Sequence, residues 1–185
     1  MRKLVAWDMM TLDGYFEGTT PWSLDFHTAV WGGELEAYSL KQLDEVGTLL
    51  FGRRTFEGMA LYWSAETGAI ADRMNAVEKV AATRHGTTVK WSNTRVLQGD
   101  VADHVAALKA ESGKKDIFVF GSADLTATLL ERQVVDEIRI CLVPVVLGCG
   151  NPLFKANGVR KDFDLVEARP FRSGGVLLRY ARADG

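Results

Sequence analysis

Two short apolar runs in this sequence each end in a glycine and then pass into a helical pattern. The first run is Thr48 to Phe51, followed by Gly52, and the second is Asp116 to Phe120, followed by Gly121. Runs this short and this apolar are typical of strands that are buried on both faces of a sheet. A buried strand that leads through a glycine turn into a helix indicates a strand-turn-helix unit, and such units favour a parallel sheet.

Strand and helix signals alternate along the rest of the chain. Further strands are predicted at residues 3–10, 79–83, 94–97, 136–147, 163–168 and 175–182. Helices are predicted at residues 34–46 with Gly47 as the stop, after Thr55, from Thr67 to Val77, from Asp100 as N-cap to about Gly113, and after Ser122. This order predicts an α/β fold with a mainly parallel central sheet, helices on both faces and an antiparallel C-terminal edge. With roughly 100 to 200 residues per domain, residues 1–185 are expected to form a single domain.

Composition narrows the possible partners. The chain has 22 basic and 24 acidic residues, a net charge of -2, so we expect neither a nucleic acid nor an anionic membrane as partner. The longest uncharged stretch, residues 140–154, is broken by prolines and glycines, and the apolar run at the N-terminus stops at Asp8, too early for a signal peptide. Cys141 and Cys149 do not form a metal-binding pattern with the histidines. We therefore expect a cytoplasmic protein without a metal.

Four strand ends carry residues suited to chemistry, and each has a plainer interpretation. Gly52-Arg53-Arg54-Thr55 and Gly121-Ser122-Ala123-Asp124 would offer free helix amides to a phosphate, or they are turns capped by Thr55 and Ser122. Thr83-Arg84 suits a phosphate monoester, or Arg84 is a surface charge. Asp13-Gly14 could relay a proton, or it is a tight turn.

Together these segments resemble the dihydrofolate-reductase-like superfamily, and within it the C-terminal reductase domain of the bifunctional riboflavin-biosynthesis deaminase/reductase. The similar segments, in order, are TLDGY, LLFGRRTFEGM, KVAATR, FVFGSADL and VDEIRICLVPVVLGCGNPLF. The resemblance covers nearly the whole chain. It implies a dihydrofolate-reductase-like fold, NADPH as cofactor, hydride transfer to a small-molecule substrate, and commonly a homodimer.

The resemblance also implies roles for single residues. Gly52, Arg53, Arg54 and Thr55 would surround the phosphates of the cofactor, and Thr83 and Arg84 would bind its 2′-phosphate. The second pyrophosphate loop would be Gly121, Ser122, Ala123, Asp124 and Leu125, with Ser122 where relatives often have a second glycine. Beside the nicotinamide would lie Ala6, Leu12, Asp13 and Gly14, and Asp13 is the candidate for the proton path.

The substrate is less well defined by the resemblance. Riboflavin-pathway reductases have a stretch with histidine, leucine and arginine that helps to hold a ribosyl phosphate, whereas residues 38–47 here contain one basic residue, Lys41. A substrate pocket lined by Trp22, Phe26, Trp31, Tyr62 and Trp63 would suit a flat ring, although these side chains are equally suited to the core or a dimer interface. The leading hypothesis is a reductase for a small heteroaromatic or carbonyl substrate. The alternatives are the phosphoribosylaminouracil reductase of riboflavin biosynthesis and a non-catalytic nucleotide-binding module.

Overall fold

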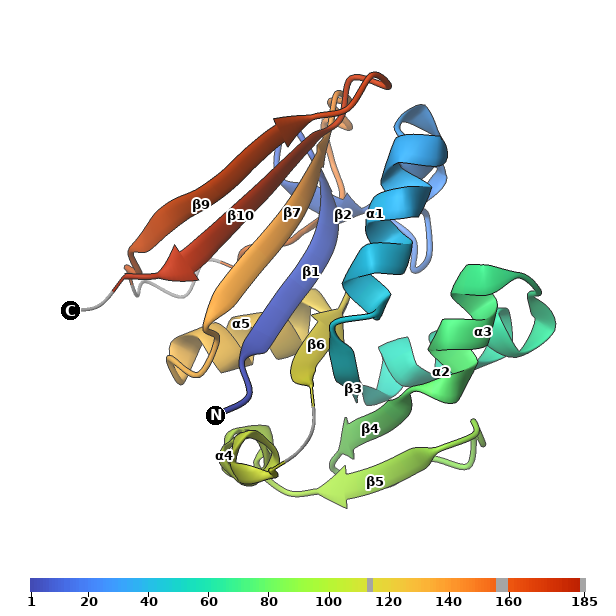
Figure 1. The fold of residues 1–185 in the computed structure, drawn as a ribbon, viewed down its shortest axis with the longest axis vertical. Coiled ribbons are helices and arrows are strands. Elements are labelled where there is room, and N and C mark those ends of the chain that lie inside the picture. Colours follow the sequence, from blue (N-terminus) through green and yellow to red (C-terminus); the bar gives the residue numbers. More distant parts are fainter. Residues whose placement is uncertain (113–114, 156–159, 184–185) are drawn as a thin grey trace.

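The computed structural model describes residues 1–112, 115–155 and 160–183. An eight-stranded sheet runs through it in the order β5-β4-β3-β6-β1-β7-β10-β9 (Figure 1). Its strands are β1 (Leu4–Thr11), β3 (Val46–Gly52), β4 (Glu78–Thr83), β5 (Thr94–Gln98), β6 (Asp116–Phe120), β7 (Glu137–Val143), β9 (Phe163–Pro170) and β10 (Val176–Arg182). All neighbours from β5 to β7 are parallel, whereas β10 runs antiparallel to β7 and to β9. The predicted mainly parallel sheet with an antiparallel C-terminal edge is confirmed.

Helices cover both faces of this sheet (Figure 1). Helices α4 (Val101–Ala110) and α5 (Ala123–Glu131) share a core with Leu4 of β1. Helices α2 (Arg53–Ala65) and α3 (Ala69–Ala76), with the end of α1 (Gly33–Leu43), share a second core with Val5. Because consecutive residues of a strand point to opposite faces, the two cores lie on opposite sides of the sheet. The predicted two-sided helix packing is confirmed.

The helix caps differ from the prediction at two places. The first helix ends at Leu43, and Gly47 lies inside β3, where a Cβ atom would stand 2.5 Å from the carbonyl oxygen of Lys115. This glycine is therefore required by close backbone packing and does not stop the helix. Thr67 does not cap α3, because Gly68 is the N-cap and no side chain bonds the first turn.

One predicted cap is confirmed in detail. Asp100 precedes α4 and its carboxylate accepts a hydrogen bond from the backbone N–H of Ala102 at 2.8 Å. The helix ends at Ala110. Gly113, where the sequence predicts the end, lies outside the described residues.

Three small elements were not predicted from the sequence. Strands β2 (Tyr15–Glu17) and β8 (Asn151–Pro152) pair antiparallel in a separate two-stranded sheet, and η1 (Asp25–Ala29) is a single 3-10 segment. Strand β7 also ends at Val143, before Pro144, and so is shorter than predicted. Strands of two or three residues carry no periodic signal, and their pairing depends on segments that are distant in the sequence.

A buried group of charges joins the parallel strands to the antiparallel edge. Oε1 of Glu137 on β7 accepts hydrogen bonds from Nε of Arg139 at 2.7 Å and from Nε of Arg179 on β10 at 2.9 Å. Arg139 also donates to Glu45 at 2.8 Å. Glu137 and Arg139 are each 3% exposed. Burial by itself would raise the pKa of Glu137, but the two arginines outweigh it and hold that pKa below its ordinary value.

Within residues 1–112, 115–155 and 160–183, none of the helices combines the length and the apolar character needed to cross a membrane. The same residues contain no group of three or more His, Cys, Asp or Glu side chains placed to hold a metal ion. Cys141 is buried, Cys149 is exposed, and both are free thiols.

Candidate functional site

The chain changes its winding direction between two neighbouring strands. Strands β3 and β6 are parallel and adjacent, yet the helix that follows β3 packs on one face of the sheet and the helix that follows β6 packs on the other. At such a switch point the two connections separate and leave a crevice at the carboxyl ends of the strands. A cleft of about 1920 Å³ lies there.

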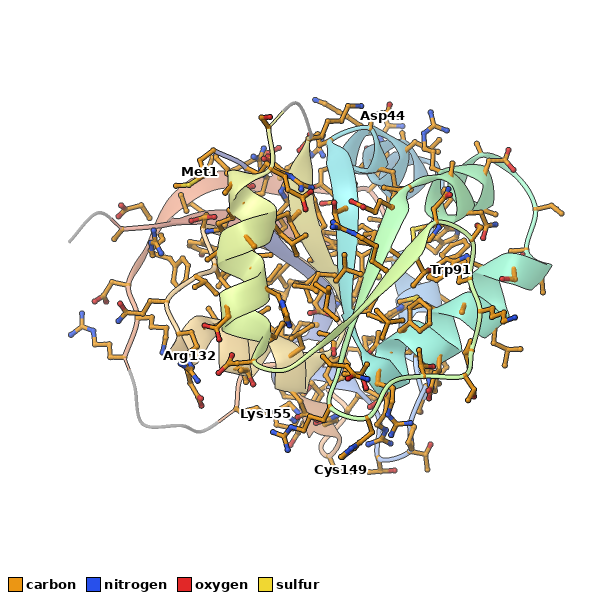
Figure 2. All side chains as sticks on the ribbon, turned by 90° about the horizontal axis from the view of Figure 1, so that it is seen from below. Met1, Asp44, Trp91, Arg132, Cys149 and Lys155 are labelled. Carbon is orange, nitrogen blue, oxygen red and sulfur yellow. The ribbon has the colours of Figure 1, made fainter. Side chains whose placement is uncertain are left out.

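Figure 2 shows both ends of the parallel strands. Met1 and Asp44 lie at the end where these strands begin, and Cys149 and Lys155 lie at the opposite end, where the strands stop. The cleft is lined by residues from this second end, including Gly52, Gly121 and Gly150. The cleft therefore lies at the position that the fold leaves open for a ligand.

The two glycine turns meet inside this cleft. A Cβ atom on Gly52 would stand 3.0 Å from Oγ of Ser122, and one on Gly121 would stand 3.6 Å from Cγ2 of Thr55. The N-cap of α2 is Gly52 itself, and the N-cap Ser122 makes no side-chain hydrogen bond to α5. The interpretation of Thr55 and Ser122 as capping side chains is therefore wrong. Two helix N-termini lie side by side without side-chain caps, an arrangement that binds anions.

Three arginines supply the positive charge of the cleft. Arg53 and Arg54 follow β3, and Arg84 follows β4. Arg53 is paired with Glu57 at 3.4 Å. Arg54 and Arg84 are exposed and have no ion-pair or hydrogen-bond partner among the described residues. Two guanidinium groups without a partner among the described residues thus line the same cleft as the N-termini of α2 and α5.

Ser122 adopts a backbone conformation that serine rarely takes. Its φ is 69° and its ψ is 63°, in the left-handed region, directly after Gly121 with φ 67°. A residue with a Cβ atom loses roughly 1 to 2 kcal/mol in this region. Tertiary contacts around Ser122 must therefore offset the conformational free energy that its left-handed backbone costs.

This cost predicts the effect of a glycine at position 122. Ser122→Gly should raise the free energy of unfolding by about 1 kcal/mol, because glycine adopts positive φ without strain. Denaturant unfolding measures the change. The control is Ser64→Gly, inside α2, which should lower the same quantity by about 0.5 kcal/mol. A destabilised Ser122→Gly variant would contradict the predicted strain.

Aromatic side chains line another part of the cleft. Trp22, Trp31, Tyr62 and Trp63 all belong to its wall, whereas Phe26 is 5% exposed and packs in the core with Val30 and Leu35. The sequence was consistent with a pocket or a core position for each of the five rings. The structure places four of them in the cleft wall and Phe26 in the core.

Trp22 is held at the cleft in a strained conformation. Its φ is 67°, and its backbone N–H donates to Glu17 at 2.6 Å. The indole ring lies against Gly58 of α2, where a Cβ atom would overlap it. Positive φ in a bulky residue is an outlier that persists where the surroundings impose it, and such residues cluster at ligand sites.

Three glutamates contribute negative charge to the cleft. Glu17 of β2, Glu36 of α1 and Glu66 after α2 line the cleft. His27 of η1 also lines it, and its Nε2 is buried without a hydrogen-bond partner in the described part of the chain. Burial lowers the pKa of His27 to about 4, against the opposing charge of Asp25. His27 is therefore neutral at physiological pH.

Several residues that the resemblance assigned to the cofactor lie outside the cleft wall. The residues of this group are Ala6, Leu12, Asp13, Gly14 and Thr83. Ala6 is part of the core on the α5 side, and Oγ1 of Thr83 donates to the carbonyl oxygen of Gly86 at 3.1 Å. Leu12 is 56% exposed. The structure does not bring these five residues together with the two phosphate-suited turns.

Asp13 holds two loops together. Its carboxylate accepts hydrogen bonds from Oγ1 of Thr11 at 2.6 Å, from N of Leu147 at 3.2 Å and from N of Gly148 at 2.7 Å. The bond from Thr11, followed by those from the loop amides, lowers the pKa of Asp13. An ionised carboxylate with three donors accepts hydrogen bonds and has no proton to give, which matches the tight-turn interpretation of Asp13-Gly14.

An acidic residue that the sequence motifs do not single out lies inside the cleft. Asp8 of β1 lines the wall and is 7% exposed. Burial raises its pKa well above the ordinary value for an aspartate. The signal in the sequence is a single charge inside the apolar run LVAWDMM.

Comparisons with known proteins agree with this fold. The model of the RibD C-terminal domain family matches residues 2–177. The uncharacterized protein YyaP of Bacillus subtilis is 28% identical over 192 aligned positions, which cover 97% of this chain and 94% of YyaP. A putative riboflavin biosynthesis protein from Shewanella sp. PV-4 has a similar structure, with a TM-score of 0.81, 19% identity, and coverage of 98% of this chain and 99% of that one.

A dihydrofolate reductase from Enterococcus faecalis, solved as a complex with NADP(H), also has this fold. Its TM-score is 0.63 with 15% identity, and the alignment covers 98% of this chain and 97% of the reductase. The α/β fold is thus dihydrofolate-reductase-like. The match over residues 2–177 shows that the chain belongs to the RibD C-terminal domain family.

Proposed function

We propose that this protein is an NADPH-dependent reductase that transfers a hydride to a small heteroaromatic or carbonyl substrate. One observation carries the proposal: the turns at Gly52 and Gly121 meet in one cleft at helix N-termini without side-chain caps, and two arginines that have no partner among the described residues line the same cleft. A dinucleotide phosphate has a diphosphate and a separate 2′-phosphate. Adjacent helix N-termini suit the diphosphate, and a guanidinium suits the phosphate monoester.

The residues of the cleft fit such a cofactor. The amides at the starts of α2 and α5 would hold the diphosphate, and the missing Cβ atoms of Gly52 and Gly121 leave room for the approach. Arg84 would pair with the 2′-phosphate. The reduced nicotinamide supplies the hydride when it is bound. The chain then has to hold the flat ring of the substrate beside the nicotinamide and exclude water. Trp22, Trp31 and Trp63 in the cleft wall can do this.

The riboflavin-pathway alternative is less well supported by the cleft. The basic residue of the stretch 38–47, Lys41, does not line it, and α1 contributes Leu35, Glu36, Ser39 and Gln42 instead. This set contains one carboxylate and no basic side chain, so α1 offers no positive charge to a ribosyl phosphate. Complementation of a bacterial strain that lacks the pathway reductase tests this alternative, and growth at normal expression would favour it over the leading proposal.

A thermal-shift experiment tests the cofactor. At 100 times its dissociation constant, a ligand of the native state adds about 2.7 kcal/mol of stability, which corresponds to a rise in Tm of roughly 5 to 10 °C for a chain of this size. We expect this rise with NADPH, a smaller one with NADH, and oxidation of NADPH with a member of a panel of ketones, quinones, pterins and pyrimidines. NADPH binding without turnover of any acceptor would instead favour a non-catalytic nucleotide-binding module.

Arg84→Ala tests the 2′-phosphate contact. The loss of a charge-assisted hydrogen bond should weaken NADPH binding by roughly 1.5 to 3 kcal/mol, or about 10-fold to 150-fold, and leave NADH binding unchanged. Isothermal titration calorimetry with both cofactors measures the difference. The control is Arg172→Ala, which removes an exposed arginine outside the cleft. Equal losses for NADPH and NADH would contradict the role of Arg84.

A further inference from the structure

Asp8 is a buried acid in the wall of the cleft. It lies on the same face of β1 as Ala6 and Met10, which pack in the core on the α5 side. On this face, where the strand reaches the cleft, the side chain of Asp8 is part of the cleft wall and is 7% exposed. A Cβ atom on Gly121 would stand 4.0 Å from Oδ1 of Asp8. The acid thus lies directly beside the second glycine turn.

No side chain or backbone group in the described part of the chain compensates Asp8. Its carboxyl group takes part in no hydrogen bond and no ion pair there, whereas the carboxylate of the similarly buried Glu137 is held by two arginines. The charged side chains that line the cleft around Asp8 are Arg53, Arg54, Arg84, Glu17, Glu36, Glu66 and Asp124. On the neighbouring strand β7, Arg139 is paired with Glu137 and Glu45, and β6 next to the site ends in Phe120.

Burial disfavours the charged form of an acid, and within the described residues no cation or hydrogen-bond donor offsets this effect at Asp8. Burial accordingly raises the pKa of Asp8 well above its ordinary value. A neutral carboxyl group has an O–H donor. Asp8 is the acidic residue of the cleft wall that is buried and whose carboxyl group has no partner among the described residues, and a catalytic role is one physical explanation for such a group.

We propose that Asp8 is the catalytic proton donor of this reductase, placed beside Gly121 to protonate the heteroatom of the bond that is reduced. The proposal rests on the function proposed above. The reduced nicotinamide, when bound, would give up a hydride and be oxidised; this hydride would form the new C–H bond, and the π electrons of the C=O or C=N bond would move onto the oxygen or nitrogen. That atom takes the proton of Asp8, so the Asp8 O–H bond breaks and the new O–H or N–H bond forms. Water then returns a proton to the Asp8 carboxylate.

The first test compares wild type with Asp8→Asn, using phenanthrenequinone and pterin as acceptors under anaerobic conditions. The amide keeps the size of the side chain but has no acidic proton. We expect kcat to fall about 100-fold to 10,000-fold, while the dissociation constant of NADPH changes by less than about threefold. In wild type, kcat should decrease as pH rises and Asp8 ionises, and this decrease should be absent from the residual activity of the variant. Asp103→Asn, on the exposed side of α4, is the matched control.

The second test needs no turnover. Carbon NMR of aspartate-labelled protein should show one carboxyl group that is still protonated at neutral pH and that is missing in Asp8→Asn. The folded state raises the pKa of Asp8, so its stabilising effect is complete below the ordinary aspartate value and is lost as pH rises toward the folded-state value. The Tm of wild type relative to Asp8→Asn should therefore decrease as pH rises above 4. A structural role would instead leave Asp8→Asn destabilised at every pH.

The outcomes separate the two proposals. If wild type oxidises NADPH and Asp8→Asn does so with the same kcat and the same pH profile, Asp8 is not the proton donor, and the reductase proposal stands. If the NMR titration shows Asp8 ionised at neutral pH, the proton-donor role is also contradicted. If wild type turns over neither acceptor nor any other member of the panel, both the proposed function and the role of Asp8 are contradicted.

Discussion

Glu137→Gln is expected to lower the free energy of unfolding by about 3 kcal/mol, because it leaves the buried Arg139 without its nearest counter-charge. The corresponding decrease in Tm is roughly 6 to 12 °C. The amide can still accept one hydrogen bond, but it cannot balance both Arg139 at 2.7 Å and Arg179 at 2.9 Å. Because this group of charges connects β7 to β10, the loss should also appear in hydrogen exchange of the β9–β10 hairpin.

The same carboxylate gives a pH signature. The pKa of Glu137 in the folded protein lies below its ordinary value of 4.5, so its stabilising effect is complete above that value and is lost as pH falls through the folded-state pKa. The difference in stability between wild type and Glu137→Gln should therefore shrink below pH 4.5. The control is Glu167→Gln, which removes a partner of Arg179 that is 33% exposed, and it should cost less than about 1 kcal/mol. Similar losses for the two variants would contradict the importance of burial.

Gly52→Val is expected to weaken NADPH binding by about 100-fold or more, equivalent to about 3 kcal/mol. A Cβ atom at position 52 would stand 3.0 Å from Oγ of Ser122. The two methyl groups of valine would then occupy the gap between the two glycine turns. A diphosphate would then lose its approach to the amides of both α2 and α5. Fluorescence titration with NADPH measures the affinity.

The fold should survive this substitution. Gly52 has φ -71° and ψ 155°, an extended conformation that valine adopts readily, and the neighbouring Ser122 hydroxyl can rotate away. Gly33→Val is the matched control, because Gly33 also lies at a helix N-terminus and a Cβ atom there meets nothing within 4 Å. Unchanged NADPH binding by Gly52→Val would show that the diphosphate does not lie between these turns.

Local patterns in the sequence were sufficient for the main elements of the fold. The apolar run DIFVF became β6 and the Asp100 cap became the start of α4, because strand burial and helix capping depend on residues that are close together along the chain. The prediction for Gly47 was wrong because its role is set by Lys115, which is distant in the sequence. The prediction for Thr67 was wrong for a local reason, because the adjacent Gly68 is the N-cap.

The sequence by itself determined which segments would carry phosphate-suited chemistry, since glycines and arginines at strand ends are visible without coordinates. Only the tertiary structure decided which of these segments meet. Gly52 lies so close to Ser122 that a Cβ atom on Gly52 would stand 3.0 Å from its Oγ, because β3 and β6 are neighbouring strands whose following helices pack on opposite faces. The structure also decided which acid lacks a partner. The carboxylate of Asp13 accepts hydrogen bonds from the nearby Thr11 and from two backbone amides of a distant loop, at Leu147 and Gly148, whereas Asp8 has no such donor among the described residues. Contacts from distant segments influence whether a carboxyl group is protonated, and no local pattern encodes them.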